Sequence, residues 1–229
     1  MAAALAVVDL LPTSGVIGLG SGTTLAYAIE EVGKRVRAGR MSIVGVPTSY
    51  QARLLAYQYG IPIRDSMDVD HVDVTMDGAD EVDPRGNLIK GGGGAHATEK
   101  LVAAASKRLI IIVDESKIVQ ELGHRFAVPA DVFPAGLAYA MRRFRDLGGA
   151  PEVRSGKGKI GPVISDLGNI VVDIRFDGIP DPARLDAQLN AIPGVVAHGL
   201  FVGLASQAVV SRPPADKPSV QVLEFQRPT

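Results

Sequence analysis

Residues 15–33 read GVIGLGSGTTLAYAIEEVG, and this segment sets the expected fold of the first half of the chain. Gly15–Leu19 is a short apolar run that ends in glycines, which is typical of a buried strand. Gly33 stands where a following helix would end. The segment therefore predicts a strand, a glycine turn and a helix whose apolar face carries Leu25, Ile29 and Val32.

The same alternation continues along the chain. The turn at Pro84–Asn87 suggests a small hairpin within the series, and strict alternation of strands and helices is typical of a parallel sheet covered on both faces. The opening MAAALAVVDLL is interpreted as a short packed helix, because it lacks the basic residues of a signal peptide and Asp9 interrupts it. Further strands are predicted at Ser42–Val46, His71–Met76 and Leu109–Val113, and further helices at Tyr50–Tyr59, Thr98–Ala105 and Ser116–Leu122.

The second half of the chain follows a different order. Strands are predicted at Phe126–Val132, Glu152–Arg154, Asn169–Phe176 and Val195–Phe201, and helices at Ala135–Leu147 and Pro182–Ile192. This β-α-β-β-α-β order is the split βαβ, ferredoxin-like plan. The tail carries two more strand-like runs, at 208–211 and 220–225, that could return to the first sheet. We therefore expect a Rossmann-like parallel sheet domain formed by residues 1–125 and 203–229, with a smaller α+β domain inserted at residues 126–202.

The composition excludes several classes of protein. The 229 residues include 24 basic and 25 acidic side chains, so no broad charge points to nucleic acid or to an anionic membrane. No run approaches the roughly 18 apolar residues of a membrane span. The chain has no cysteine, which rules out disulfides and thiolate sites and is compatible with a reducing, cytoplasmic location.

The loop Gly18–Thr24 lies between the first predicted strand and helix. Its glycines allow a tight turn, and the free N–H groups at the start of the helix favour an anion. Ser21, Thr23 and Thr24 add hydroxyl donors, so a phosphate is the natural ligand. The loop lacks the third glycine of a dinucleotide fingerprint and the lysine of a Walker loop. A small phosphorylated ligand is therefore favoured, with a purely structural turn as the alternative.

An acidic loop follows the third predicted strand and reads Asp77-Gly78-Ala79-Asp80-Glu81. Because the carboxyl ends of parallel strands line one crevice, this loop should share a crevice with the glycine loop. Two carboxylates separated by small residues can reach one ligand without crowding it. The alternative is an Asx-type turn with solvated acids.

Residues 90–100 contain four consecutive glycines. Ordering them costs considerable chain entropy, and a close approach of the backbone to a ligand is one reason to accept that cost. Lys90 precedes the glycines, and Glu99 falls in the first turn of the next helix, where a carboxylate is commonly a capping partner. A loose linker and a capping Glu are therefore the alternatives to a site. His96 and Glu99 could share a helical face, but no third metal ligand is evident.

Several segments, taken together, resemble successive motifs of the type A ribose-5-phosphate isomerases. They are GLGSGTT, DGADE, KGGGGA followed by EK, and DESK. The later segments LGGAPEVR, GPVISDLGNIVVD and NAIPGVVAHGLF also look like that family. The order and spacing match over nearly the whole chain, and the combination is specific although each piece alone is not.

The resemblance implies an isomerase that interconverts D-ribose 5-phosphate and D-ribulose 5-phosphate through an enediolate, in the non-oxidative branch of the pentose phosphate pathway. It implies Glu99 as the general base and Lys90 as the cation that stabilises the enediolate oxygen. Asp77 and Asp80 would hold sugar hydroxyls and assist ring opening. No metal or organic cofactor is needed, because this proton transfer requires only a base and an oxyanion stabiliser. The implied substrate contacts are Ser21, Gly22, Thr23, Thr24, Asp77, Gly78, Ala79, Asp80, Lys90, Gly91, Gly92, Gly93 and Lys117.

The chain departs from the family pattern beside the implied base. His96 stands where an aliphatic residue is usual, and Thr98 where a long residue is usual, which bears on the packing of this helix. The main alternative function is a non-catalytic sugar-phosphate sensor domain, which would not need the lysine and all three carboxylates together. A related sugar-phosphate deaminase or lactonase and a dead paralogue are further alternatives. Homodimers and homotetramers are common in the family, so a homo-oligomer is expected.

Overall fold

Six strands form the main sheet of the computed structural model, which describes residues 2–158, 160–212 and 219–227. Neighbouring strands are parallel, except for the two strands nearest the C-terminus of the chain, which pair antiparallel to each other. The tail therefore returns to the first sheet, as predicted. The strands, in order across the sheet, are β13 (Ser219–Glu224), β12 (Gln207–Arg212), β6 (Ser106–Asp114), β3 (Val72–Gly78), β1 (Ser14–Leu19) and β2 (Ser42–Pro47).

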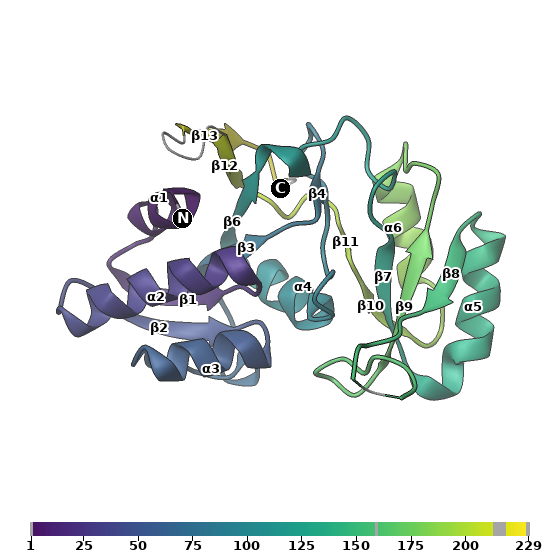
Figure 1. Ribbon diagram of the computed structural model, residues 1–229, viewed down its shortest axis with the longest axis horizontal. Coiled ribbons are helices and arrows are strands. Elements are labelled where there is room, and N and C mark those ends of the chain that lie inside the picture. The colour runs from purple at the N-terminus through teal and green to yellow at the C-terminus, as the bar shows by residue number, and fades with distance from the viewer. Residues whose placement is uncertain (1, 159, 213–218, 228–229) are drawn as a thin grey trace.

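Helices cover both faces of this sheet, as Figure 1 shows. The alternation of side chains along β6 explains the arrangement: Ile110 and Ile112 belong to one hydrophobic cluster with residues of α1 (Ala2–Asp9), α2 (Thr23–Arg37) and α3 (Tyr50–Gln58). Leu109 and Ile111 point to the opposite face, where they pack in a cluster with Ala103 of α4 (His96–Ala104). A strand buried on both faces has to be apolar throughout. None of the described helices is both long and apolar enough to cross a membrane.

A second sheet is antiparallel and carries the predicted ferredoxin-like plan. Its strands run in the order β10-β7-β9-β8, and in the chain they alternate with two helices as β-α-β-β-α-β. Phe144 and Leu189, one from each helix, are fully buried in its core. The elements are β7 (Val128–Val132), the 3₁₀ turn η3 (Pro134–Gly136), α5 (Leu137–Asp146), β8 (Ala150–Val153), β9 (Ile170–Arg175), α6 (Pro182–Asn190) and β10 (Val195–His198).

A small three-stranded sheet joins the two larger ones. The predicted hairpin is present as β4 (Glu81–Val82) and β5 (Leu88–Ile89), and β5 pairs with β11 (Leu200–Phe201). The Asp83 carboxylate accepts hydrogen bonds from the backbone N–H groups of Arg85 and Asn87, which explains the tight turn. Helix α4 contacts both β3 and β6 of the main sheet and β10 of the second. In Figure 1 it lies between the two sheets.

Two predicted element boundaries and one predicted helix are wrong. Helix α2 continues past Gly33 to Arg37. Gly33 does not end the helix; it is a glycine because Tyr59 packs against it, and an added Cβ would lie 2.5 Å from the Tyr59 Cβ. The predicted strand at Val195–Phe201 is divided at Gly199 into β10 of the second sheet and β11 of the small sheet. The backbone N–H of Gly199 donates to the Pro129 carbonyl, and the Gly199 carbonyl accepts from the backbone N–H of Lys90.

The helix predicted at Ser116–Leu122 is only the 3₁₀ turn η2 (Glu115–Lys117). Val119 then bonds to the backbone of Val82, and the Leu122 carbonyl accepts from Ile179. The apolar spacing that suggested a helix serves instead to bury Val119 and Leu122 in the core of the second sheet. A further 3₁₀ turn, η1 (Ser66–Asp68), precedes β3.

Candidate active site

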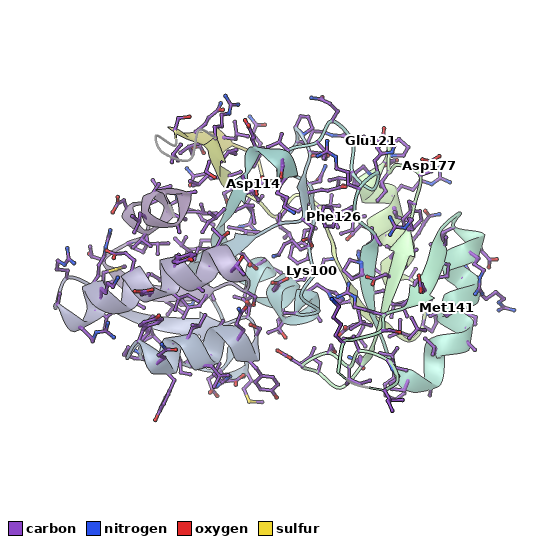
Figure 2. The ribbon with its side chains drawn as sticks, viewed as in Figure 1. Lys100, Asp114, Glu121, Phe126, Met141 and Asp177 are labelled. Carbon is purple, nitrogen blue, oxygen red and sulfur yellow. The ribbon has the colours of Figure 1, made fainter. Side chains whose placement is uncertain are left out.

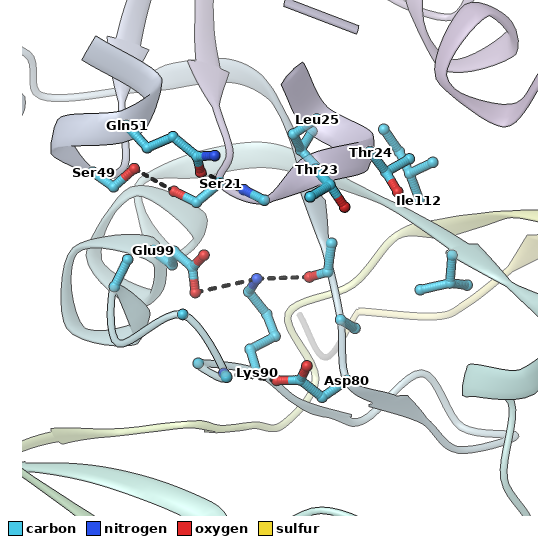
Figure 3. A pocket seen from close by; sticks show the side chains of 18 of the residues that line it. Ser21, Thr23, Thr24, Leu25, Ser49, Gln51, Asp80, Lys90, Glu99 and Ile112 are labelled. Carbon is cyan, nitrogen blue, oxygen red and sulfur yellow. Dashed lines mark hydrogen bonds and ion pairs between the residues drawn. The ribbon is translucent and has the colours of Figure 1, made fainter. Parts of the chain in front are cut away.

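A cavity of about 380 Å³ opens at the carboxyl ends of β1, β3 and β6, where ligands bind in parallel sheets. Figure 3 shows the side chains that line it. Asp77 does not line the cavity: it is fully buried and lies behind Lys90. The residues named from the sequence that line the cavity are Ser21, Gly22, Thr23, Thr24, Gly78, Ala79, Asp80, Lys90, Gly91, Gly92, Gly93, Glu99 and Lys117.

The glycine loop, residues Gly18–Thr24, is packed closely against β3. An added Cβ at Gly18 would lie 1.9 Å from the Thr75 hydroxyl oxygen, and one at Gly20 would lie 2.4 Å from the Met76 carbonyl oxygen. Only glycine allows the loop this close. Gly22 is the N-cap of α2 and supplies no side-chain cap, so the first turn of α2 offers free N–H groups to the cavity.

The loop after β2 also reaches the cavity, and the sequence analysis did not single it out. The Ser21 hydroxyl donates to the Ser49 hydroxyl at 2.6 Å, and the backbone N–H of Gly22 donates to the Gln51 side chain at 2.8 Å. Because β1 and β2 are parallel neighbours, their carboxyl ends meet at one edge, and this signal was present in the sequence. Asp166, in the loop between β8 and β9 of the second sheet, joins them by accepting a hydrogen bond from the backbone N–H of Tyr50.

Lys90 is the buried cation of the site. Its side chain donates to the Gly78 carbonyl at 2.6 Å and lies 3.0 Å from Asp77 Oδ2 and 3.2 Å from Glu99 Oε2. Burial alone would lower the pKa of this ammonium, but the two carboxylates outweigh burial and raise it. Lys90 is therefore protonated, with its charge directed into the site.

Glu99 is the buried carboxyl of the site, in the first turn of α4, and Figure 3 shows it facing Lys90. Burial and the charge of Asp77 raise the pKa of Glu99 to about 8, against the opposing effect of Lys90. The physical reason is that one ammonium cannot neutralise two buried carboxylates. Its pKa is therefore near neutral, the range in which a carboxylate can take up a proton and release it again.

Asp80 connects the acidic loop to the four glycines. Its Oδ2 accepts a hydrogen bond from the backbone N–H of Gly92 at 2.9 Å, and its own N–H donates to the Ile89 carbonyl. Lys117, in η2, also lines the cavity, and its ammonium lies 4.5 Å from the centre of the Phe126 ring. Phe126 is labelled in Figure 2.

His96 and Glu99, both in α4, have different partners: Glu99 lies beside Lys90, whereas His96 faces the second sheet. Its Nε2 atom lies 3.5 Å from Asp131 Oδ1 of β7, and both side chains are fully buried. Burial lowers the pKa of His96 to about 3, so the ring is neutral. Among the described residues, no group of three or more metal-ligating side chains is present.

Comparisons with known proteins show which family the chain resembles. The model of the family "Ribose 5-phosphate isomerase A (phosphoriboisomerase A)" matches residues 44–214. The ribose-5-phosphate isomerase A of Thermosynechococcus vestitus is 49% identical over 217 residues, which are 94% of this chain and 92% of that protein. The relative of the same name from Nostoc is 46% identical over 93% of this chain and 91% of its own.

Two solved structures are also similar over nearly their whole length. Ribose 5-phosphate isomerase A of Methanocaldococcus jannaschii has a TM-score of 0.90 at 38% identity, covering 97% of this chain and 96% of that one. A D-ribose-5-phosphate isomerase in complex with phospho-erythronic acid has a TM-score of 0.91 at 41% identity, with the same coverage.

Proposed function

The chain belongs to the ribose 5-phosphate isomerase A family, and we propose that Glu99, Lys90, Asp77 and Asp80 perform its reaction in the cavity described above. The protein is an aldose–ketose isomerase that interconverts D-ribose 5-phosphate and D-ribulose 5-phosphate. The alternative of a non-catalytic sugar-phosphate sensor gains no support from the relatives named above.

The position of the Lys90 ammonium, within 3.2 Å of Glu99 and 3.0 Å of Asp77, is the observation that supports these roles. Isomerisation removes a proton from the carbon beside a carbonyl and returns it to the neighbouring carbon. Glu99 is the base that carries this proton, and Lys90 stabilises the negative oxygen of the enediolate. A sugar oxygen held by Lys90 would lie next to Glu99, so one geometry serves both steps.

We assign the two ends of the substrate to opposite walls of the cavity. The phosphate is placed at the N-terminus of α2, with Ser21–Thr24 and Lys117 around it, because free N–H groups and the helix dipole favour an anion there. The reacting carbons lie beside Lys90 and Glu99. Asp77 holds the ammonium from behind, and Asp80 is placed to bind sugar hydroxyls. The remaining proposed contacts are the backbones of Gly78, Ala79 and Gly91–Gly93.

Our proposals also cover the pathway, the cellular location, the assembly and the domain division of the protein. We place the enzyme in the non-oxidative branch of the pentose phosphate pathway and in the cytoplasm, as a homodimer or homotetramer. Light scattering on the purified protein tests the assembly. We also propose the division into residues 1–125 with 203–229 and residues 126–202, which is supported by the separate hydrophobic cores of the two larger sheets.

The test compares the wild type with Glu99→Gln for ribose 5-phosphate isomerisation, in the presence of a chelator. We expect the wild type to turn over and the variant to lose roughly 10²- to 10⁴-fold in kcat, because a positioned base contributes that much. Substrate binding should be largely retained. Equal activity in both proteins would refute Glu99 as the base, and binding without turnover in both would favour a dead enzyme or a sensor.

A further inference from the structure

Arg154 follows β8 in the second sheet, and its side chain reaches across to the four glycines. The Nε and Nη2 groups donate to the two carboxylate oxygens of Asp173 on β9, the Nε bond at 2.7 Å. The third nitrogen, Nη1, donates to the carbonyl oxygens of Gly91 and Gly92 at 3.0 and 3.1 Å. The guanidinium is thus held rigidly by one carboxylate while it holds two peptide units of the active-site loop.

The peptide units that Arg154 holds belong to a tight turn, Gly91–Gly94, which we call the glycine turn. The backbone N–H of Gly94 donates to the Gly91 carbonyl at 2.9 Å, which closes the turn. Gly91 and Gly94 have positive φ, whereas the two central residues, Gly92 and Gly93, do not. Negative φ at both central positions is the type I arrangement, and type II requires positive φ at the second of them.

The orientation of the central peptide unit distinguishes these two turn types. With glycine at both central positions, the unit between Gly92 and Gly93 can rotate to type II without steric cost. The bond from Arg154 to the Gly92 carbonyl holds that unit in one orientation. In a planar trans peptide the N–H points opposite to the carbonyl, so the N–H of Gly93 points away from Arg154. Gly93 lines the cavity, and its N–H has no hydrogen-bond partner within the described part of the chain.

We propose that Arg154 is a positioning residue for the isomerase reaction: it fixes the central peptide unit of the glycine turn so that the N–H of Gly93 is directed at the substrate oxygen held by Lys90. Rotation of that unit would replace the N–H donor with the Gly92 carbonyl and oppose negative charge at the reacting oxygen. Arg154 acts through the backbone and touches no substrate. The inference rests on the proposed roles of Lys90 and Glu99.

The test measures kcat and KM for Arg154→Gln, Arg154→Lys and the matched control Arg175→Gln. Arg175 is an exposed arginine at the end of β9 in the same sheet. We expect both Arg154 variants to lose roughly 10- to 100-fold in kcat, less than the roughly 10²- to 10³-fold known for complete loss of one oxyanion donor. KM should change less than about threefold, and the control should match the wild type. Lysine keeps the charge but cannot bind Asp173 and both carbonyls together.

A double-variant cycle separates positioning from a merely structural role. Alanine at Gly93 disfavours the positive φ of a type II turn, and its Cβ would meet no protein atom within 4 Å. The Arg154→Gln substitution should therefore cost less in kcat in a Gly93→Ala background than in the wild type. An equal cost in both backgrounds would overturn the proposal.

Two other outcomes would also overturn it. Arg154 variants with the kcat of Arg175→Gln would show that the turn keeps its orientation unaided, and a rise in KM at unchanged kcat would make Arg154 a substrate-binding group. Should Arg154→Gln fail to fold, Arg154→Lys carries the same comparison. Glu99→Gln, assayed in parallel, tests the proposed base separately, so failure of one proposal is distinguishable from failure of the other.

Discussion

Two glycine-rich segments line the same cavity and are held in opposite ways. The glycine loop, Gly18–Thr24, has no room for a side chain at Gly18 or Gly20, because these two residues lie against the backbone and side chains of β3. The glycine turn, Gly91–Gly94, has open space at Gly93 and depends on side chains from elsewhere, namely Asp80 and Arg154. Close packing at Gly18 and Gly20 shapes the first segment. In the second, packing against His96 and Pro129 is confined to Gly91, and hydrogen bonds from distant parts of the chain hold the central residues.

This difference corresponds to the two tasks that we propose for the cavity. The glycine loop presents a helix N-terminus, a static feature suited to binding a phosphate. The glycine turn stands between Lys90 and Glu99 in the sequence, so its backbone orientation bears directly on the reacting atoms. Substitutions near the loop should therefore change mainly stability and KM, and those near the turn should change mainly kcat.

After loss of the proposed base, removal of the Lys90 ammonium should give the largest effect. Lys90→Gln leaves Asp77 and Glu99 without the cation that now lies 3.0 and 3.2 Å away. We expect kcat to fall by roughly 10²- to 10³-fold, the usual effect of losing one electrostatic stabiliser of an oxyanion. Steady-state kinetics on folded protein measures this loss. If Lys90→Gln changes KM alone, Lys90 binds the substrate and does not stabilise the enediolate.

Alanine at the two kinds of glycine should separate packing from hydrogen bonding. Gly20→Ala puts a Cβ 2.4 Å from the Met76 carbonyl oxygen, and overpacking of this kind costs about 1–3 kcal/mol of unfolding free energy. Gly93→Ala meets no atom within 4 Å and should leave stability nearly unchanged. Urea unfolding of both variants measures the difference. Equal losses would show that packing also constrains the turn at Gly93.

The pH dependence of stability should report the buried charge beside the turn. The pKa of Glu99 is raised from 4.5 to about 8, so between these values the folded state binds a proton that the unfolded state has lost. Stability contributed by this group therefore falls as pH rises through that window. Glu99→Gln removes the effect, and its unfolding free energy relative to the wild type should improve by at least about 1 kcal/mol between pH 5 and pH 9. Parallel curves for the two proteins would contradict the raised pKa.

A hydroxyl of the glycine loop should give the smallest effect. Thr23→Ala keeps the helix N-terminus and removes one proposed phosphate contact, which is worth about 0.5–1.5 kcal/mol for a typical hydrogen bond. We expect KM to rise by roughly threefold to tenfold, the equivalent of that free energy, with kcat within about twofold of the wild type. Tyr27→Ala, an exposed position on the same helix, is the control. A change confined to kcat would contradict the proposal that the glycine loop binds the phosphate and that the reacting atoms lie beside the glycine turn.

The sequence predicted the elements whose signals are local. The main sheet, the split βαβ order and the hairpin at Pro84–Asn87 all follow from apolar periodicity and turn residues, and the structure contains them. The errors arose where a distant partner overrides the local signal. Gly33 continues a helix because Tyr59 packs on it, and residues 118–122 extend because Val82 and Ile179 supply their backbone partners.

The same limit applies to the cavity. Residues of all four motifs named from the sequence line the cavity, but the contribution of Asp166 depends on a contact with Tyr50 across 116 residues of chain. Arg154 was part of the segment LGGAPEVR, but its role did not follow from the sequence. Its hydrogen bonds to Gly91 and Gly92 span more than 60 positions of the chain. His96 was noted as unusual, yet nothing local could show that it turns toward Asp131.

The pairing of β5 with β11 bears on how this protein can be redesigned. The backbone N–H of Lys90 donates to the Gly199 carbonyl at 2.8 Å, and Gly199 in turn donates to Pro129 of β7. The lysine at the centre of the cavity is therefore anchored through its main chain to the segment that closes the second sheet. A shortened version that deletes residues 126–202 would remove that anchor. Grafting or circular permutation should accordingly keep Leu88–Lys90 and His198–Phe201 together as one unit.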